Sequence, residues 1–342
     1  HQVEEITRSD ASAHNLSVTT TKISQIIEDS KANHKKSICF VTGVPGAGKT
    51  LAGLNIATVR AKEHGDENAV FLSGNGPLVE VLREALSRDE SVREGISKKD
   101  AHRKVASFIQ NIHHFRDEAL KSDLAPYEKV VIFDEAQRAW TKEKATSFMK
   151  SKGKDFDMSE PEFLIDVMNR HENYCNIICL VGGGQEINTG EAGLSEWVIA
   201  LKNHYPNWDI YYSNLITADN DYLNDETLKE WLKESGNPEN ELHLSVSVRS
   251  FRSEKISCFV HEIIDGNAIL AKSILNEIST LFPIRLTRDF NVAKEWLRKN
   301  KKGTERIGIV GSSGGRRLRS LGIDVKNDGG QLFYMALLTF VC

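Results

Sequence analysis

The stretch GVPGAGKT, residues 43–50, decides the fold of this chain. It has the form GxxxxGK[ST], it follows the apolar run SICFVT (37–42), and it opens a helical pattern at Lys49. Its inner glycines allow backbone conformations that turn several N–H groups towards one anion, and the helix N-terminus adds a favourable dipole. The sequence therefore predicts a strand, a phosphate-binding loop and a helix in that order, which together form a P-loop.

Each position of this loop has an expected role. The cofactor-binding residues are expected to be Gly43, Val44, Pro45, Gly46, Ala47, Gly48, Lys49 and Thr50. Lys49 is expected to reach the β- and γ-phosphates of ATP, and the Thr50 hydroxyl is expected to bind Mg²⁺. The alternative is a glycine-rich turn with a chance lysine, and the strand before the motif and the helix after it argue against that alternative.

A second stretch, VVIFDEAQR (130–138), supplies the carboxylates that a P-loop ATPase needs. Four apolar residues end in Asp134, which at a strand tip is expected to hold Mg²⁺. Glu135 is placed to polarise the attacking water as a general base. A solvated acidic pair at a strand end is the alternative. The adjacent glutamate favours hydrolysis, because a kinase would activate a substrate hydroxyl instead of water.

Short apolar runs alternate with helical patterns through the first two-thirds of the chain. The strand candidates are residues 37–42, 69–73, 104–110, 129–134, 176–181 and 209–213. Continuous apolar runs are typical of strands covered on both faces, and strand–helix alternation favours right-handed crossovers. The sequence therefore predicts an α/β fold with an open parallel sheet and helices on both faces. GGGQEIN (182–188) follows one of these strands, so Gln185 is a candidate for sensing the γ-phosphate or orienting water; a flexible glycine turn is the alternative.

The alternation restarts after KESGNPENE (233–241), a stretch rich in turn-forming residues. Further strands are expected at 241–248, 283–288 and 306–313, and further helices at 254–265 and 292–300. We therefore expect a lead-in segment at 1–35, a P-loop domain at 36–235 and a smaller second domain at 236–342.

Composition places the chain among globular proteins, with 342 residues, 40% hydrophobic, 27% charged and a net charge of −4. That charge gives no global electrostatic footprint for nucleic acid, although a local basic groove can form on an acidic protein. No apolar run is long enough to cross a bilayer, so no membrane partner is expected. Five cysteines without a CxxC pair favour reduced thiols in a cytoplasmic protein.

Seven stretches, in this order, resemble one known family. They are GVPGAGKT, FLSGNGPLV, FIQNIHHFRDEAL, FDEAQRAW, GGGQEINTGEAGLSEW, LSVSVRSFRSEKISCFV and GIVGSSGGRRLRSLGI. Together they look like the bacterial helicase-like family of unknown function that carries a Schlafen-type P-loop domain, which is itself similar to superfamily 1 helicases. The resemblance covers roughly residues 37–322. The DEAQ and GGGQEINTG blocks in register are its most specific part.

The resemblance implies two RecA-like domains, with Mg-ATP hydrolysed in the cleft between them and single-stranded DNA or RNA crossing their tops. It implies that Gln137 links ATP to the second domain, and that Ser73 and Asn75 contact the nucleic-acid backbone. An arginine that faces the γ-phosphate in the family is matched by Arg249 or Arg252.

Two departures from the family bear on function. Its third motif, GDxxQ, reads GGGQ here, which removes the aspartate and shifts Gln185. The last residues, GGQLFYMALLTFVC (329–342), do not resemble the family's continuation, so we expect a truncated or frame-shifted, partial second RecA-like domain.

Three functions therefore stay open. They are an ATP-driven motor on DNA or RNA, a switch-like ATPase that acts on a protein partner, and a nucleotide-binding module with weak turnover. The basic stretch RKNKKGTERIG (298–308) and the arginines at 316, 317 and 319 favour the first, but a solvated surface explains them as well.

Overall fold

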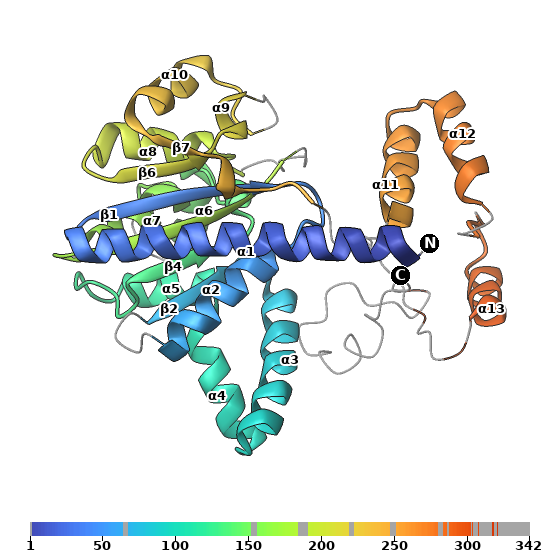
Figure 1. The fold of residues 1–342 in the computed structure, drawn as a ribbon, viewed down its shortest axis with the longest axis horizontal. Coiled ribbons are helices and arrows are strands. Elements are labelled where there is room, and N and C mark those ends of the chain that lie inside the picture. Colours follow the sequence, from blue (N-terminus) through green and yellow to red (C-terminus); the bar gives the residue numbers. More distant parts are fainter. Residues whose placement is uncertain are drawn as a thin grey trace. The chain divides into compact units, whose positions relative to one another are not determined.

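The computed structural model describes residues 2–63, 68–151, 156–183, 191–218, 222–246, 251–279, 283–285 and 287–301, and the single residues 303, 307, 317 and 320. The chain divides into two compact units, His1–Val248 and Arg249–Cys342 (Figure 1). The boundary between them falls after Val248, whereas the sequence indicated a boundary near residue 236.

The first unit is built on one eight-stranded sheet. Its order is β3-β2-β4-β5-β1-β6-β7, with β8 also paired to β1, and all of these pairs are parallel. The strands are β1 (Lys36–Gly43), β2 (Ala69–Ser73), β3 (Ile109–Asn111), β4 (Val130–Phe133), β5 (Cys175–Gly182), β6 (Asp209–Ser213), β7 (Asn237–Glu239) and β8 (His243–Leu244). Strands β2, β4 and β5 are buried along their whole length, which is why their sequences are continuous apolar runs. The predicted parallel α/β sheet is confirmed.

Helices cover both faces of this sheet (Figure 1). Helices α1 to α4 share one apolar core with the sheet, and α5, α7, α8 and α10 share the other. Neighbouring strand residues such as Phe40 and Val41 lie in different cores, because successive side chains point to opposite faces. The helices are α1 (Gln2–Asn33), α2 (Lys49–Glu63), α3 (Gly76–Glu94), α4 (Lys98–Phe108), α5 (Ile112–Ala119), α6 (Lys142–Ser151), α7 (Glu160–Asn169), α8 (Ser195–His204), α9 (Leu215–Ala218) and α10 (Glu226–Ser235), with two 3₁₀ turns, η1 (Ala136–Arg138) and η2 (Asn240–Leu242).

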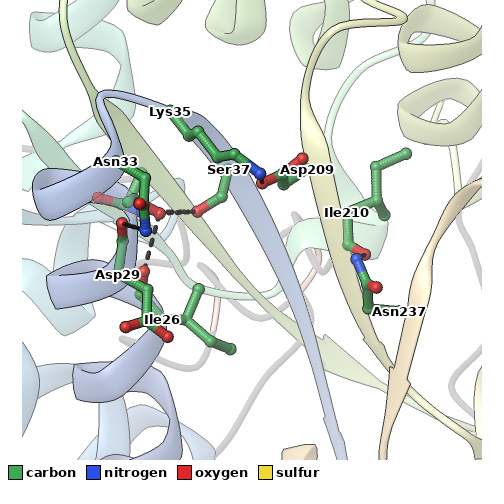
Figure 2. Close-up of polar contacts among 10 residues, drawn as sticks. Ile26, Asp29, Asn33, Lys35, Ser37, Asp209, Ile210 and Asn237 are labelled. Atoms are coloured by element: carbon green, nitrogen blue, oxygen red, sulfur yellow. Dashed lines mark hydrogen bonds and ion pairs between the residues drawn. The ribbon is translucent and has the colours of Figure 1, made fainter.

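Polar contacts fix the start of β1 between α1 and the neighbouring strand β6 (Figure 2). The hydroxyls of Ser30 in α1 and Ser37 in β1 lie 2.9 Å apart, and both are buried. Lys35 Nζ donates to Asp209 Oδ2 at 2.9 Å, which ties the residue before β1 to β6. The first strand therefore cannot shift without breaking contacts to α1 and β6.

The strand predicted at residues 104–110 is wrong for most of its length. Residues up to Phe108 belong to α4, and only Ile109–Asn111 forms a strand. Ser97 caps the helix, because its hydroxyl accepts a hydrogen bond from the Asp100 N–H at 3.1 Å. The buried residues of α4 are Ala101, Val105 and Phe108, and this spacing places them on one helix face.

Of the strand predicted at 241–248, the structure describes residues 241–246, and among these only β8, which has two residues, pairs with β1; residues 247 and 248 lie outside the described residues. β7 and β8 both belong to the first sheet, so the segment in which the sequence indicated a boundary is part of the first unit.

The described residues of the second unit form three helices, α11 (Phe251–Ile264), α12 (Ala268–Ile278) and α13 (Phe290–Asn300), and no strand. The residues described within 283–288 are all exposed and not extended into a strand, so the strand predicted there is wrong for those residues. Phe259, Ala271 and Ile278 form the buried contact between α11 and α12. The RecA-like character of this unit stays a prediction. In the part of the chain that the structure describes, no helix is both long and apolar enough to span a bilayer.

Candidate functional site

The loop between β1 and α2 has a backbone shape that its glycines permit. Gly46 and Gly48 have φ angles of 77° and 88°, in the left-handed region that favours glycine. The Ala47 N–H donates to Val44 O at 3.0 Å and closes a turn inside the loop. The first N–H groups of α2, which have no partner within the helix, therefore lie at the end of this turn.

β8 lies against the beginning of this loop. Val44 N donates to Leu244 O at 3.0 Å, and Gly43 is in register with Leu244. A Cβ atom added at Gly43 would lie 2.9 Å from Leu244 Cβ and 3.1 Å from Leu244 O. Gly43 is therefore required because the backbone of β8 approaches so closely.

The Lys49 side chain folds back over the loop. Its Nζ donates to Gly43 O at 2.7 Å and, more weakly, to Val44 O at 3.4 Å. The ammonium group therefore lies against the main-chain oxygens at the start of the loop.

Thr50 and Asp134 meet across the end of the sheet. Thr50 Oγ1 lies 3.2 Å from Asp134 Oδ1 and 3.3 Å from Asp134 Oδ2. Asp134 directly follows β4, which is separated from β1 by β5. A hydroxyl and a carboxylate are oxygen ligands of the kind that Mg²⁺ prefers. Thr50 and Asp134, the two residues that the sequence predicts as metal ligands, therefore lie within hydrogen-bond distance of each other. Among the described residues no cluster of three or more His, Cys, Asp or Glu side chains is able to hold a metal ion.

Asp134 is 3% exposed. Burial first, and then the charge of Glu135, raise the pKa of Asp134 to about 6, while the Thr50 hydrogen bond and the Lys49 charge oppose the rise. An ionised carboxylate in this position is poorly solvated, so a bound cation would stabilise it.

Glu135 has an unusual backbone, with φ 55° and ψ 49°. A non-glycine residue in this left-handed region costs about 1–3 kcal/mol and persists only where its neighbours hold it. Its carboxylate accepts a hydrogen bond from Gln137 Nε2 at 2.5 Å, and Arg138 Nε lies 3.7 Å away. The residue predicted as the general base is therefore held in a defined place beside Asp134.

Gln137 is buried and makes three bonds that join separate parts of the site. Besides donating to Glu135, it accepts from Gly182 N through Oε1 and from Gly193 N through its main-chain oxygen, both at 3.0 Å. It therefore connects Glu135 to residues on both sides of the segment that follows β5. Contact between Gln137 and the cofactor stays a prediction. The three hydrogen bonds described above all join Gln137 to residues of the first unit.

Three predicted residues are not brought to this site by the described part of the chain. Gln185 and Arg249 lie outside the described residues. Arg252 belongs to α11 of the second unit, and its side chain is not among those described. Their roles at the γ-phosphate stay predictions.

Ser73 and Asn75 have local partners at the start of α3. Asn75 Oδ1 accepts from Leu78 N at 3.2 Å, and Ser73 Oγ accepts from Asn75 N at 3.2 Å. Both side chains therefore shape the turn after β2, and their contact with nucleic acid stays a prediction.

The sequence analysis did not predict three hydrogen-bonded polar side chains close to the phosphate-binding loop. His243 Nδ1 lies 2.9 Å from Thr42 Oγ1, and Thr42 donates to Ser213 Oγ at 2.6 Å. Burial first, and the nearby Lys49 charge second, lower the pKa of His243. The three residues come from β1, β6 and β8, so no local motif signals the contact.

A second missed feature fixes the chain after β4. The Arg116 guanidinium lies over the rings of Trp140 and Phe148, at 5.7 and 5.2 Å from their centroids. Glu160 Oε2 accepts from Trp140 N at 3.0 Å, and Glu160 Oε1 is 3.9 Å from Arg116 Nη1. Arg116 and Glu160 are both buried, so Trp140 belongs to a packed cluster.

Two comparisons with known proteins found similar proteins. The family model described as Schlafen group 3, DNA/RNA helicase domain, matches residues 36–335, which is well over half of the chain. The crystal structure of the Pyrococcus furiosus Hef helicase domain is similar at 19% identity with a TM-score of 0.31, covering 55% of this chain and 37% of that chain. This chain thus spans just over a third of the length of that helicase structure. No curated protein matches. On the extent of the family match, the chain belongs to the Schlafen group 3 DNA/RNA helicase domain family.

Proposed function

We propose that this protein binds and hydrolyses Mg-ATP and couples the reaction to binding of, or movement along, single-stranded DNA or RNA. The observation that carries the proposal is the contact between the Thr50 hydroxyl and the Asp134 carboxylate, at 3.2 and 3.3 Å. This contact supports the proposal because a hydroxyl at the start of α2 and a carboxylate at the tip of β4 are oxygen groups of the kind that Mg²⁺ prefers. The description of the family as a DNA/RNA helicase domain supports the nucleic-acid part.

In this proposal the loop from Gly43 to Thr50 holds the triphosphate. The N–H groups at the start of α2 would donate to phosphate oxygens. Lys49 would exchange its neutral acceptors, Gly43 O and Val44 O, for charged phosphate oxygens, which accept stronger hydrogen bonds. Thr50 and Asp134 would hold Mg²⁺, which when bound neutralises phosphate charge.

Glu135 would take a proton from the attacking water. Its side chain is 37% exposed, so water has access to it, whereas the neighbouring Asp134 is buried. The hydrogen bond from Gln137 and the fixed left-handed backbone limit where the Glu135 carboxylate lies. A positioned base of this kind typically contributes about 10²- to 10⁴-fold in rate.

The test is the ATPase rate with and without single-stranded DNA and RNA, for the wild type and for Lys49→Ala and Glu135→Gln. We expect both substitutions to lower turnover by about 100-fold or more. Glu135→Gln should retain ATP binding, because it keeps the loop and both metal ligands. Lys121→Ala and Glu118→Gln are matched controls, since these two residues form an exposed ion pair, and their rates should equal that of the wild type.

The same assay separates the other functions. Hydrolysis that single strands do not stimulate would favour a switch-like ATPase that acts on a protein partner. ATP binding with negligible turnover would favour a nucleotide-binding module. Unchanged hydrolysis in both Lys49→Ala and Glu135→Gln would contradict the site itself.

A further inference from the structure

One face of α1 contacts the segment that ends the described part of the first unit, although α1 lies before residue 36, where the family match begins. Lys22 Nζ is 2.7 Å from Glu239 Oε1, and Thr19 Oγ1 donates to Glu241 O at 2.6 Å. Positions 15, 19 and 22 are four and three residues apart, so they share one helix face. The hydroxyl of Thr19 is part of a fully buried side chain, so its bond to the segment is shielded from water.

The side chain of Asn15 forms hydrogen bonds with the main chain on one edge of β8. Its Nδ2 donates to His243 O at 3.3 Å, and its Oδ1 accepts from Ser245 N at 2.9 Å. Leu244, the residue between them, uses its main-chain oxygen on the other edge to accept from Val44 N at 3.0 Å. The Asn15 amide therefore stands where a further strand would otherwise pair, and it satisfies main-chain groups that need a partner.

Leu16 reaches the phosphate-binding loop directly. It and Val44 pack against a small buried cluster made of Ala47, Ala52 and Leu244. α1 thus contacts the loop in two ways, through the side chain of Leu16 and through β8.

We infer that Asn15 and Thr19 are positioning residues for the nucleotide site, acting on the loop through residues 241–245. β8 has only two residues, so its place depends on what holds both of its edges. Where Leu244 O lies decides where the Val44 N–H lies, and with it the first turn of the loop. The inference rests on the proposed function, because ATP is the ligand whose affinity reports the position of the loop.

Matched variants isolate each contact in the full chain. Thr19→Val removes the hydroxyl at nearly constant volume, and Thr19→Ser keeps it. Thr20→Val is the control, because Thr20 Oγ1 bonds to Leu16 O and Ser17 O inside α1. Asn15→Ala is paired with Asn33→Ala, because Asn33 Nδ2 bonds to Asp29 O inside α1 (Figure 2).

Two measurements test the inference. The first is the Kd for Mg-ATP by calorimetry, and the second is amide hydrogen exchange across residues 43–50 without nucleotide. We expect Thr19→Val and Asn15→Ala each to raise Kd by about three- to tenfold, the effect of one or two lost hydrogen bonds, and to speed exchange at Val44. Thr19→Ser should restore both values, and the two controls should stay within about twofold of the wild type.

A lowered melting temperature with unchanged Kd and unchanged exchange would overturn the inference, because α1 would then support the fold alone. If the wild type itself did not bind Mg-ATP, the proposed function would fail. Exchange at Val44 would then decide the inference by itself, faster in Thr19→Val supporting it and unchanged refuting it.

Discussion

Asp134, at the tip of β4, has a buried carboxyl group, and burial destabilises the charged form of that group. Its pKa is raised from 3.8 to about 6, chiefly by burial. The folded state therefore holds the proton more tightly than the unfolded state does. Between about pH 4 and about pH 6 the folded protein loses stability as pH rises, and above about pH 6 the loss is complete, at about 3 kcal/mol for a shift of this size.

We therefore expect Asp134→Asn to stabilise the protein in the absence of Mg²⁺ and nucleotide. The gain should approach about 3 kcal/mol above pH 6 and vanish below about pH 4, because both forms are then neutral. Urea unfolding at several pH values measures it. Asp123→Asn, at an exposed position, is the control and should show no such trend. A gain that did not depend on pH would contradict the argument.

Local geometry that follows from neighbours in sequence could be predicted, and contacts with distant partners could not. Gly46, Gly48, Lys49 and Thr50 lie in one loop whose spacing determines their geometry. Gln137 forms hydrogen bonds with Gly182 and Gly193, which are distant from it in the sequence. No sequence pattern near Gln137 predicts these bonds.

At the scale of elements, α2 lies unusually close to the sheet at Gly53. A Cβ atom there would lie 2.8 Å from Leu180 Cδ1, 2.9 Å from Ile132 Cγ2 and 3.1 Å from Phe71 Cε2. All three neighbours are fully buried, so they have little room to move. This close packing sets the position of the helix whose first residues are Lys49 and Thr50.

Gly53→Ala should therefore destabilise the protein. Alanine is favoured over glycine in a helix by about 1 kcal/mol, whereas overpacking a filled core costs about 1–3 kcal/mol. We expect a net loss in the free energy of unfolding, measured in urea, together with weaker Mg-ATP binding. Gly74→Ala is the control, because a Cβ there would meet only Ile112 Cγ2, at 3.9 Å. A net gain in stability from Gly53→Ala would show that α2 can move away from the sheet at no cost.

Element prediction succeeded where burial on both faces leaves a continuous apolar run, as in β2 and β5. It failed at residues 104–110, where one apolar helix face of α4 resembles a strand over a short window. It also predicted a strand at residues 241 and 242, which form the 3₁₀ turn η2, and the contacts of Asn15 and Thr19 with this segment come from α1, which no local pattern near residue 243 reveals.

At the scale of the whole molecule, the folded first unit extends beyond the family match. α1 buries Ile23, Ile26 and Ile27 at 0%, 3% and 0% exposure against β1, β5 and α2. Burying each such side chain stabilises a fold by roughly 1.5–3 kcal/mol. Three of them together are comparable to the entire stability of a typical domain, about 5–15 kcal/mol.

A fragment of residues 36–342, which starts where the family match starts, should therefore be unfolded or melt far below the full chain. The cause is the lost apolar contact of α1, so a single substitution tests it without truncation. Ile27→Ala should lower the free energy of unfolding by about 2–5 kcal/mol, whereas Ile269→Ala, at a side chain 88% exposed, should change it little. Circular dichroism melting of the fragment and urea unfolding of both variants measure these effects. If residues 36–342 melted with the full chain, α1 would be an addition to a self-sufficient domain, and its contacts with β8 would then have to be explained by the nucleotide site alone.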